Sequence, residues 1–242
     1  MSHLRGIKII GLSLVAMLAL AAFAAASASA SQPSAELESG TFPVSFTGSG
    51  GEGTLEVLPT PTRTVTCTSN SSKGNIASAT TVNKVNVIFK GCTSTGPFGI
   101  KVNCSTSGAA TGEIISTSLK GSLFYLTAGS NAAGTDLEPE SGTEFAKFTC
   151  GGLETLTVTG SVVGKLTPVN GPFSTSFTLT FSQKEGHQEP EGYLAASGCG
   201  FVKDVLNTAG TGFESFSKQS GVKGTETVTA TKKLKIVSSK CV

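Results

Sequence analysis

This chain of 242 residues has no tryptophan and only two tyrosines, two histidines and two methionines. Carbohydrate sites commonly use exposed tryptophan and tyrosine rings as contact surfaces, so a sugar site is only weakly indicated. Tyr125 is expected in the core, and Tyr193 is the better contact candidate. Asp136 and Asp204 are the only aspartates, which excludes a calcium loop of the D-x-D type.

Charged residues of either sign are also scarce, because they make up only 14% of the chain. Nucleic-acid binding usually requires a concentrated basic face, so we expect no nucleic-acid partner. One basic cluster occurs near the C-terminus, and a solvated strand face or edge protection explains it best. Its members are Lys232, Lys233, Lys235 and Lys240.

The sequence lacks a credible catalytic set. Hydrolysis by a side-chain nucleophile needs a neighbouring base, most often histidine. Only His187 is available beyond residue 3, and its surroundings, KEGHQEPEG, favour a solvated loop. A glycosidase instead needs two carboxylates about 5–9.5 Å apart. Candidates lie in two polar stretches, where we expect the acids to be solvated: Glu138, Glu140 and Glu144, and Glu185, Glu189 and Glu191.

Other site motifs are incomplete as well. There is no G-x-S-x-G elbow, no C-x-x-C pair for zinc, and GSVVGK at 160–165 is one residue short of a P-loop. GSGGEG at 48–53 matches the dinucleotide pattern, but a strand rather than a helix follows, so we predict a glycine-rich hairpin. We predict no catalytic residue, cofactor or metal, and a protein that is not an enzyme.

What the sequence does contain begins with a secretory signal peptide at residues 1–30. Arg5 and Lys8 give a positive start, 9–24 form an apolar run, and two A-x-A matches place cleavage after Ala28 or Ala30. The run is shorter than the ~20 residues of a membrane-spanning helix, and no other stretch is as apolar. We expect a soluble mature chain without a membrane span, secreted or held at the cell surface.

Removal of residues 1–30 takes away two of the 18 cations, which leaves 16 against 16 acids and a net charge near zero. Residues 31–40 are polar and are predicted to form a flexible leader. Residues 41–242 are predicted to form a single all-β domain. The partner is unknown from the sequence, and a cell-surface component or another protein is the class left open.

All six cysteines lie beyond residue 30, and an even number in an exported chain predicts three disulfides. Six cysteines allow fifteen pairings, and their spacing does not choose among them. The pairing predicted here is Cys92–Cys104, Cys67–Cys150 and Cys199–Cys241.

Alternating apolar and polar residues are the main structural signal. In Thr111–Leu126 the odd positions from Ile115 to Tyr125 are mostly apolar and the even positions are polar, which is typical of a half-buried antiparallel strand. At ~3.3 Å per residue, 112–126 would span ~50 Å. Such a strand must bend, and Gly121 is the predicted position.

A second long segment, 153–169, also carries glycines on its apolar face, which indicates a strand that coils sharply or is shared between two sheets. Thr225–Val237 closes the chain, with an apolar face made of Val228, Ala230, Leu234 and Ile236. Between them, 183–224 is predicted to be an irregular insertion or loop region, with one short helix at 201–206.

About ten strands and the absence of βαβ units give the fold class: all-β, an antiparallel β-sandwich or a coiled or closed barrel, with long bent strands at 112–126 and 153–169. Four segments carry a resemblance to a group of uncharacterised exported β-rich proteins of high-GC Gram-positive bacteria. They are Phe42–Val57, Val87–Gly96, Thr111–Leu126 and Val158–Asn170. The resemblance covers most of 42–188 and implies export, but no activity or site residue.

Three functions follow as hypotheses. The first is an exported, disulfide-containing all-β protein with a non-enzymatic surface or interaction role. The second is a small-ligand carrier, which requires an open apolar interior of a few hundred Å³ lined by the odd-numbered face of 115–125. The third is an extracellular hydrolase that uses loop carboxylates.

Overall fold

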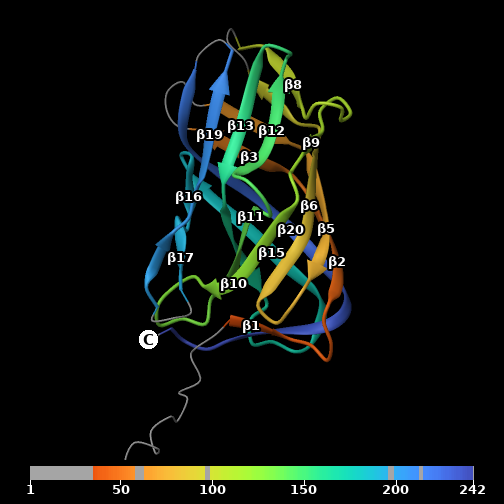
Figure 1. The fold of residues 1–242 in the computed structure, drawn as a ribbon, viewed down its shortest axis with the longest axis vertical. Helices are drawn as coiled ribbons and strands as arrows, with labels where there is room; N and C mark the ends of the chain where they lie inside the picture. The colour runs from red at the N-terminus through yellow and green to blue at the C-terminus, as the bar shows by residue number, and fades with distance from the viewer. Residues whose placement is uncertain (1–34, 58–62, 96–98, 196–198, 213–214, 242) are drawn as a thin grey trace, which may run out of the picture. The chain divides into compact units, whose positions relative to one another are not determined.

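The structure, a computed structural model, describes residues 35–57, 63–95, 99–195, 199–212 and 215–241. These residues form twenty β-strands and no α-helix (Figure 1), which confirms the all-β prediction. The predicted signal peptide at 1–30 lies outside the described residues. Within the described residues, no helix has the length and apolar character needed to cross a bilayer.

The strands are, in chain order, β1 (Ala35–Glu38), β2 (Val44–Gly50), β3 (Gly53–Val57), β4 (Arg63–Cys67), β5 (Ser69–Ile76), β6 (Thr81–Lys90), β7 (Thr93–Thr95), β8 (Lys101–Ser105), β9 (Ile114–Ile115), β10 (Leu119–Tyr125), β11 (Ala133–Pro139), β12 (Glu144–Cys150), β13 (Glu154–Gly160), β14 (Val162–Thr167), β15 (Ser174–Lys184), β16 (His187–Glu189), β17 (Gly192–Leu194), β18 (Phe201–Lys203), β19 (Leu206–Thr211) and β20 (Phe216–Ser238).

Antiparallel pairing closes these strands into a barrel of eight positions. One ring, here called the lower ring, runs β2–β5–β6–β10–β11–β14–β15–β20 and back to β2. The upper ring runs β3–β4–β7–β8–β12–β13–β19–β20 and back to β3. Strand β20 belongs to both rings. Of the two predicted architectures, the structure is therefore the barrel.

At most positions the chain passes from one ring directly into the other, as β2 does into β3 and β13 into β14 (Figure 1). Neighbours in the sequence are also neighbours around the barrel, so the topology is an up-and-down meander. We call the level at which the chain changes ring the waist. The sequence predicted about ten strands because 112–126 and 153–169 were each counted as one strand and 183–224 was predicted to be irregular.

The two predicted long strands divide at the waist. Segment 153–169 becomes β13 in the upper ring and β14 in the lower ring, which confirms the prediction of a strand shared between two sheets. Gly160 makes the transition with a φ of 92°, a conformation that side chains disfavour.

Thr111–Leu126 behaves differently from its prediction. It divides into β9 and β10, and the main-chain N–H of Thr117 donates to the carbonyl of Phe145, 2.9 Å away. The inward face changes from even to odd positions at this break, because Ser116 and Leu119 are both buried. Gly121, the predicted position of the bend, lies inside β10 at a register shift between Leu119 and Gly121 against β6, and such an irregularity bends a strand locally.

The predicted hairpin at GSGGEG is also wrong. β2 and β3 both pair with β20, with Gly50 opposite Glu226 and Thr54 opposite Lys223. The two strands therefore follow one another along β20, separated by Gly51 and Glu52. A hairpin and two successive strands on one partner both consist of two short alternating segments joined by glycines. The alternating pattern alone therefore did not distinguish them.

Two segments predicted to be irregular contain strands. Ala35–Glu38, in the predicted leader, forms β1 and pairs with the end of β20. The region 183–224 contains β16, β17, β18 and β19, and Phe201–Lys203 is strand rather than helix. The apolar residues there alternate over too few positions for the sequence to separate a short strand from a helical turn.

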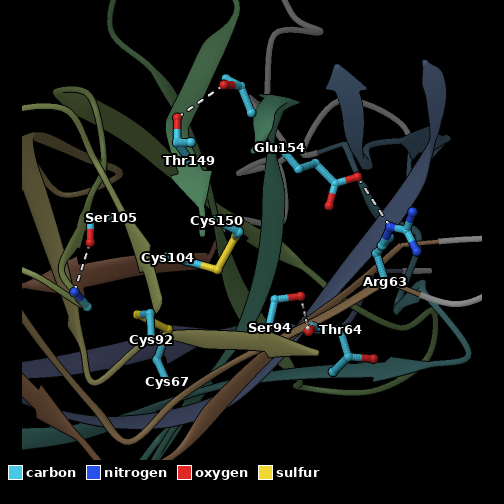
Figure 2. The surroundings of a disulfide bond; sticks show 12 residues. Arg63, Thr64, Cys67, Cys92, Ser94, Cys104, Ser105, Thr149, Cys150 and Glu154 are labelled. Carbon is cyan, nitrogen blue, oxygen red and sulfur yellow. Dashed lines mark hydrogen bonds and ion pairs between the residues drawn. A yellow bond between two sulfur atoms is a disulfide. The ribbon is translucent and has the colours of Figure 1, made fainter. Parts of the chain in front are cut away.

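Three disulfides tie the barrel, and their pairing corrects two predictions. Cys67 pairs with Cys92, Cys104 pairs with Cys150, and only Cys199–Cys241 was predicted correctly. Figure 2 shows the first two side by side in the upper ring. Cys104 and Cys150 are opposite each other in the register of β8 and β12, with Cα atoms 4.0 Å apart. The main-chain N–H of Cys104 donates to the carbonyl of Cys92 at 3.0 Å. The two residues that were predicted to form a disulfide are therefore neighbours, but no disulfide joins them.

A buried glutamine completes the ring at the waist. β15 stops pairing with β20 at Gly224, and β19 starts at Ser220, which leaves Val222 without a strand partner on that side. The side chain of Gln188 fills this place, since its Oε1 accepts from Val222 N–H at 2.9 Å and its Nε2 donates to Val222 and Ser182 carbonyls at 3.2 and 2.6 Å. Gln188 is 0% exposed.

Replacement of Gln188 by leucine should therefore destabilise the barrel strongly. The substitution leaves the N–H and C=O of Val222 and the C=O of Ser182 buried without partners, which costs about 3 kcal/mol of the free energy of unfolding. Urea denaturation measures the change. Lys184→Ala, an exposed substitution on β15, is the control and should stay within about 0.5 kcal/mol of the parent. A loss below about 1 kcal/mol for Gln188→Leu would contradict this role of the amide.

Candidate functional site

Three small apolar cavities lie inside the barrel. The lower cavity measures about 70 Å³ and is lined by residues such as Phe46, Leu123 and Leu234. The upper cavity measures about 60 Å³. The third, the waist cavity, measures about 50 Å³ and shares Phe145 with the upper cavity and Leu137 with the lower one.

These volumes bear on the carrier hypothesis. Sites for drug-sized ligands have volumes of ~300–1,000 Å³. From Leu119 onward the odd-numbered positions of 115–125 do reach the interior, where Leu123 lines the lower cavity and Leu119 and Tyr125 are 0% exposed. Each of the three cavities inside the barrel is nevertheless far smaller than the open interior that the carrier hypothesis required.

One carboxyl group lies among these apolar side chains. Glu226 points inward from β20 and lines both the lower cavity and the waist cavity. The residue is only 7% exposed, its Oε1 has no hydrogen-bond partner in the described residues, and Ser72 is its hydrogen-bonding neighbour. Burial raises the pKa of this carboxyl, because water no longer stabilises the charged form.

The neighbouring strand leaves room for this side chain. A β-carbon at Gly48, on β2, would overlap the Oε1 atom of Glu226 and the hydroxyl of Ser72. The alternation in the sequence also indicates that Glu226 points inward. The apolar face of Thr225–Val237 consists of even positions, and Glu226 is the next even position before Val228.

A second acidic group forms on the outer face of the barrel. It contains both aspartates of the chain, Asp136 on β11 and Asp204 just after β18. Asp136 Oδ1 accepts the main-chain N–H of Ser122 at 2.7 Å. Asp204 Oδ1 accepts the hydroxyl of Ser161, and its buried Oδ2 has no partner in the described residues.

Burial dominates the electrostatics of this pair. Desolvation raises the pKa of Asp136 to about 6, and the charges of Asp204 and Glu138 add to the effect. Desolvation and Glu138 likewise raise the pKa of Asp204 to about 6. A carboxyl with such a pKa exchanges protons near neutral pH, which is the requirement for a general acid or base.

The sequence candidate Tyr193 lies beside this pair. Its ring stacks on Phe124 with a centroid distance of 3.9 Å and an interplanar angle of 11°, which holds β17 against the outer face of β10. Burial, Asp136 and Asp204 raise the pKa of its hydroxyl. Tyr125 is fully buried, as predicted, with its hydroxyl 2.9 Å from Ser239 Oγ.

Two of the candidates in the stretch 185–191, His187 and Glu191, contact each other at the surface. His187 Nδ1 lies 2.8 Å from Glu191 Oε1, which also accepts from Gln219 at 2.7 Å. The bonds from Gln219 and His187 lower the pKa of Glu191.

The other acidic stretch is likewise occupied by local contacts. Glu140 accepts from the main chain of Lys84 at 2.7 Å and from Ser118 at 2.8 Å, and Glu138 pairs with Lys120 at 3.4 Å. These bonds fix strand ends and do not place two carboxylates across a described cavity.

The C-terminal lysines are distributed along the outside of β20. Lys232 donates to Thr41 Oγ1 at 2.7 Å, and Lys235 pairs with Glu38 at 3.5 Å. The part of the chain that the structure describes contains no group of three or more His, Cys, Asp or Glu side chains arranged to hold a metal ion.

Comparison with models of protein families, with curated protein sequences and with solved structures finds no match to this chain. Its function must therefore be inferred from its own residues. Among the described residues, Glu226 inside the barrel and Asp204 of the Asp136–Asp204 pair on the outer face each have a buried carboxyl oxygen without a hydrogen-bond partner.

The pair predicts a pH-dependent effect of Asp136→Asn. The pKa of Asp136 is about 6 in the folded state against an ordinary 3.8, so the penalty of burying its charge is fully present above pH 6 and disappears as the pH falls toward 3.8. Asparagine keeps the acceptor for Ser122 without the charge. The variant should be about 3 kcal/mol more stable than the parent at pH 7.5 and within about 0.5 kcal/mol of it at pH 4, as measured by denaturant titration.

Glu36→Gln serves as the control, because Glu36 is exposed on β1. Its effect should stay within about 0.5 kcal/mol at both pH values. A lower stability of Asp136→Asn at pH 7.5 would show that the carboxylate charge is favourable in the folded protein and would refute the assignment.

Proposed function

We propose that this chain is exported and acts outside the cell as a disulfide-stapled barrel with a non-enzymatic surface or interaction role. The observation that carries this proposal is the pairing of all six cysteines in three disulfides. Disulfides form and persist in oxidising compartments and are rare in the cytosol. The resemblance of 42–188 to exported proteins of high-GC Gram-positive bacteria supports the same compartment.

The barrel suits a role at the outer surface. Large inward side chains fill the interior down to cavities of about 50–70 Å³, so a bulky ligand has no space there. Two disulfides fix the upper ring, and the third joins the C-terminus to the segment between β17 and β18. A stapled barrel of this kind offers a rigid outer face for a protein or cell-surface partner.

An extracellular hydrolase is the second candidate, and one observation favours it. Asp136 and Asp204 have pKa values of about 6 and lie beside the half-buried Tyr193, which suits proton transfer. This pair differs from the loop glutamates that the sequence suggested. Activity against glycoside and ester panels that Asp204→Asn abolishes would favour the hydrolase over the non-enzymatic role.

Export can be tested by secretion of the full chain from a Gram-positive host. We expect the protein in the medium, starting at Ser29 or Ser31, with the three observed disulfides in non-reducing peptide mass mapping. Free thiols, or a chain retained in the cell with residues 1–30 attached, would contradict the proposal. Secreted protein that hydrolyses a panel substrate would leave export intact and overturn only the non-enzymatic role.

The disulfides should also contribute strongly to stability. Replacement of both Cys104 and Cys150 by serine opens a bridge with a sequence separation of 46 residues and should lower the free energy of unfolding by about 3 kcal/mol. Guanidinium denaturation without reductant measures the loss. The parent protein in excess dithiothreitol is the companion sample, and equal stability with and without reductant would be inconsistent with structural disulfides.

A further inference from the structure

Two large aliphatic side chains are exposed at one end of the barrel. Ile100, just before β8, is 62% exposed, and Leu153, between β12 and β13, is 64% exposed. The two segments meet near them, because a β-carbon at Gly151 would lie 3.1 Å from the side chain of Val102. Ile100 and Leu153 are each two residues from this contact and therefore lie at the same end. Figure 1 shows β8 at the end of the barrel opposite β1.

A groove of about 570 Å³ begins next to these two residues, since their sequence neighbours Lys101 and Gly152 line it. We call it the Lys101 groove, because Lys101 is the only charged residue that lines it. The hydroxyl groups of Ser107 and Thr111 also line the groove and have no hydrogen-bond partner in the described residues. An ammonium group and free hydroxyl donors are suited to hold a phosphate.

The charges around the groove favour an anionic partner. Glu113 and Glu154 are the acids nearest in the sequence to its lining residues. Glu113 is paired with Lys90 at 3.5 Å. Glu154 is paired with Arg63 at 3.3 Å. The positive charge of Lys101 is therefore not balanced by either of these acids.

From this arrangement we propose that this end of the barrel binds a bilayer that contains anionic phospholipid. A lipid phosphate occupies the Lys101 groove, and the side chains of Ile100 and Leu153 enter the acyl chains. Exposed aliphatic groups gain free energy when they leave water, and a lysine near an anionic lipid surface adds electrostatic attraction. Binding at a membrane surface depends on the sum of these two contributions.

The combination of groups selects this partner over two others. A soluble phosphate compound would use Lys101 but would leave Ile100 and Leu153 in water. A stable protein interface buries ~800 Å² on each partner, far more than two aliphatic side chains supply. A phospholipid surface presents phosphate directly beside hydrocarbon, which matches the groove and the two side chains together.

This inference rests on the proposed surface role and names its partner. Its test uses the oxidised chain from Ser31 onward, because the apolar run at 9–24 would itself enter a bilayer. All described residues lie beyond residue 34, so this chain contains the whole barrel and its three disulfides. Oxidative refolding supplies it whether or not a host secretes the protein, so a failure to bind vesicles is distinct from a failure of export.

Sedimentation with vesicles of equal parts dioleoyl phosphatidylglycerol and dioleoyl phosphatidylcholine at low salt tests the proposal. We expect saturable binding of the parent, and at least tenfold weaker binding of the double variant Ile100→Ser, Leu153→Ser, which lacks both aliphatic groups. Thermal unfolding should be unchanged, because both positions are exposed.

Phe173→Ser is the matched control. Phe173 is 52% exposed, but it directly precedes β15 at the end of the barrel where β1 pairs with β20. This variant should bind the vesicles within twofold of the parent. An absence of binding by the parent would overturn the proposal, and so would equal binding by the parent and the double variant.

The phosphate position has a separate test in Lys101→Gln. Loss of this charge should weaken binding to the phosphatidylglycerol vesicles about fivefold and leave binding to pure phosphatidylcholine vesicles within twofold. Lys165→Gln, at an exposed position of β14, removes the same charge elsewhere and should stay within twofold on both. Equal losses in the two variants would overturn the groove as the phosphate site. Equal binding of sn-glycerol 3-phosphate and of vesicles at the same phosphate concentration would overturn the choice of a lipid.

Insertion can be observed directly, because the chain has no tryptophan of its own. In Leu153→Trp the fluorescence maximum should move to shorter wavelength when phosphatidylglycerol vesicles are added, and brominated acyl chains should quench it, since the indole leaves water. Phe173→Trp should show neither change. An unshifted spectrum of Leu153→Trp on vesicles that bind the protein would overturn the insertion of this side chain.

Discussion

The hydrogen-bonded pairing of β20 on both of its sides is the constraint on which this structure depends. Over Phe216–Ser238 the strand pairs with β19 and β3 in the upper ring and with β15 and β2 in the lower ring. No other strand of the described residues belongs to both rings. A barrel has no exposed strand edges only when it is fully closed. The pairings of β20 close both the upper ring and the lower ring.

Polar side chains support this pairing where the main-chain ladder is interrupted. Oxygen atoms of Gln188, Asp136 and Ser116 each accept a main-chain N–H, from Val222, Ser122 and Val87 respectively. These acceptors lie at or near the waist, where the strands change ring or shift register. Several buried polar residues that resemble site residues are thus explained by the requirement that buried N–H groups be satisfied. Glu226 differs, because no described group forms a hydrogen bond with its Oε1.

Alternation predicted the all-β class and the inward face of the last strand, because a period of two depends on neighbouring residues alone. The interruptions were not predictable in the same way, since Thr117 and Gln188 act on carbonyls and amides that are distant in the sequence. The disulfide pairing failed for a related reason: Cys92 is adjacent to Cys104 but is bonded to Cys67. The inward position of Glu226 could be predicted from the alternation. The contact of Asp204 with Ser161 could not, because it depends on the path of β17 and β18.

Because β20 follows all of its partner strands in the sequence, it sets the order in which the barrel can form. Its pairing with β2 joins residues up to 184 positions apart, as for Ala230 and Phe46. A polypeptide synthesised from its N-terminus presents β2 and β3 long before their closing partner exists. The early strands therefore keep an open edge until β20 has been synthesised, and a chain that stops before β20 would lack the segment that converts a curled sheet into a sealed cylinder.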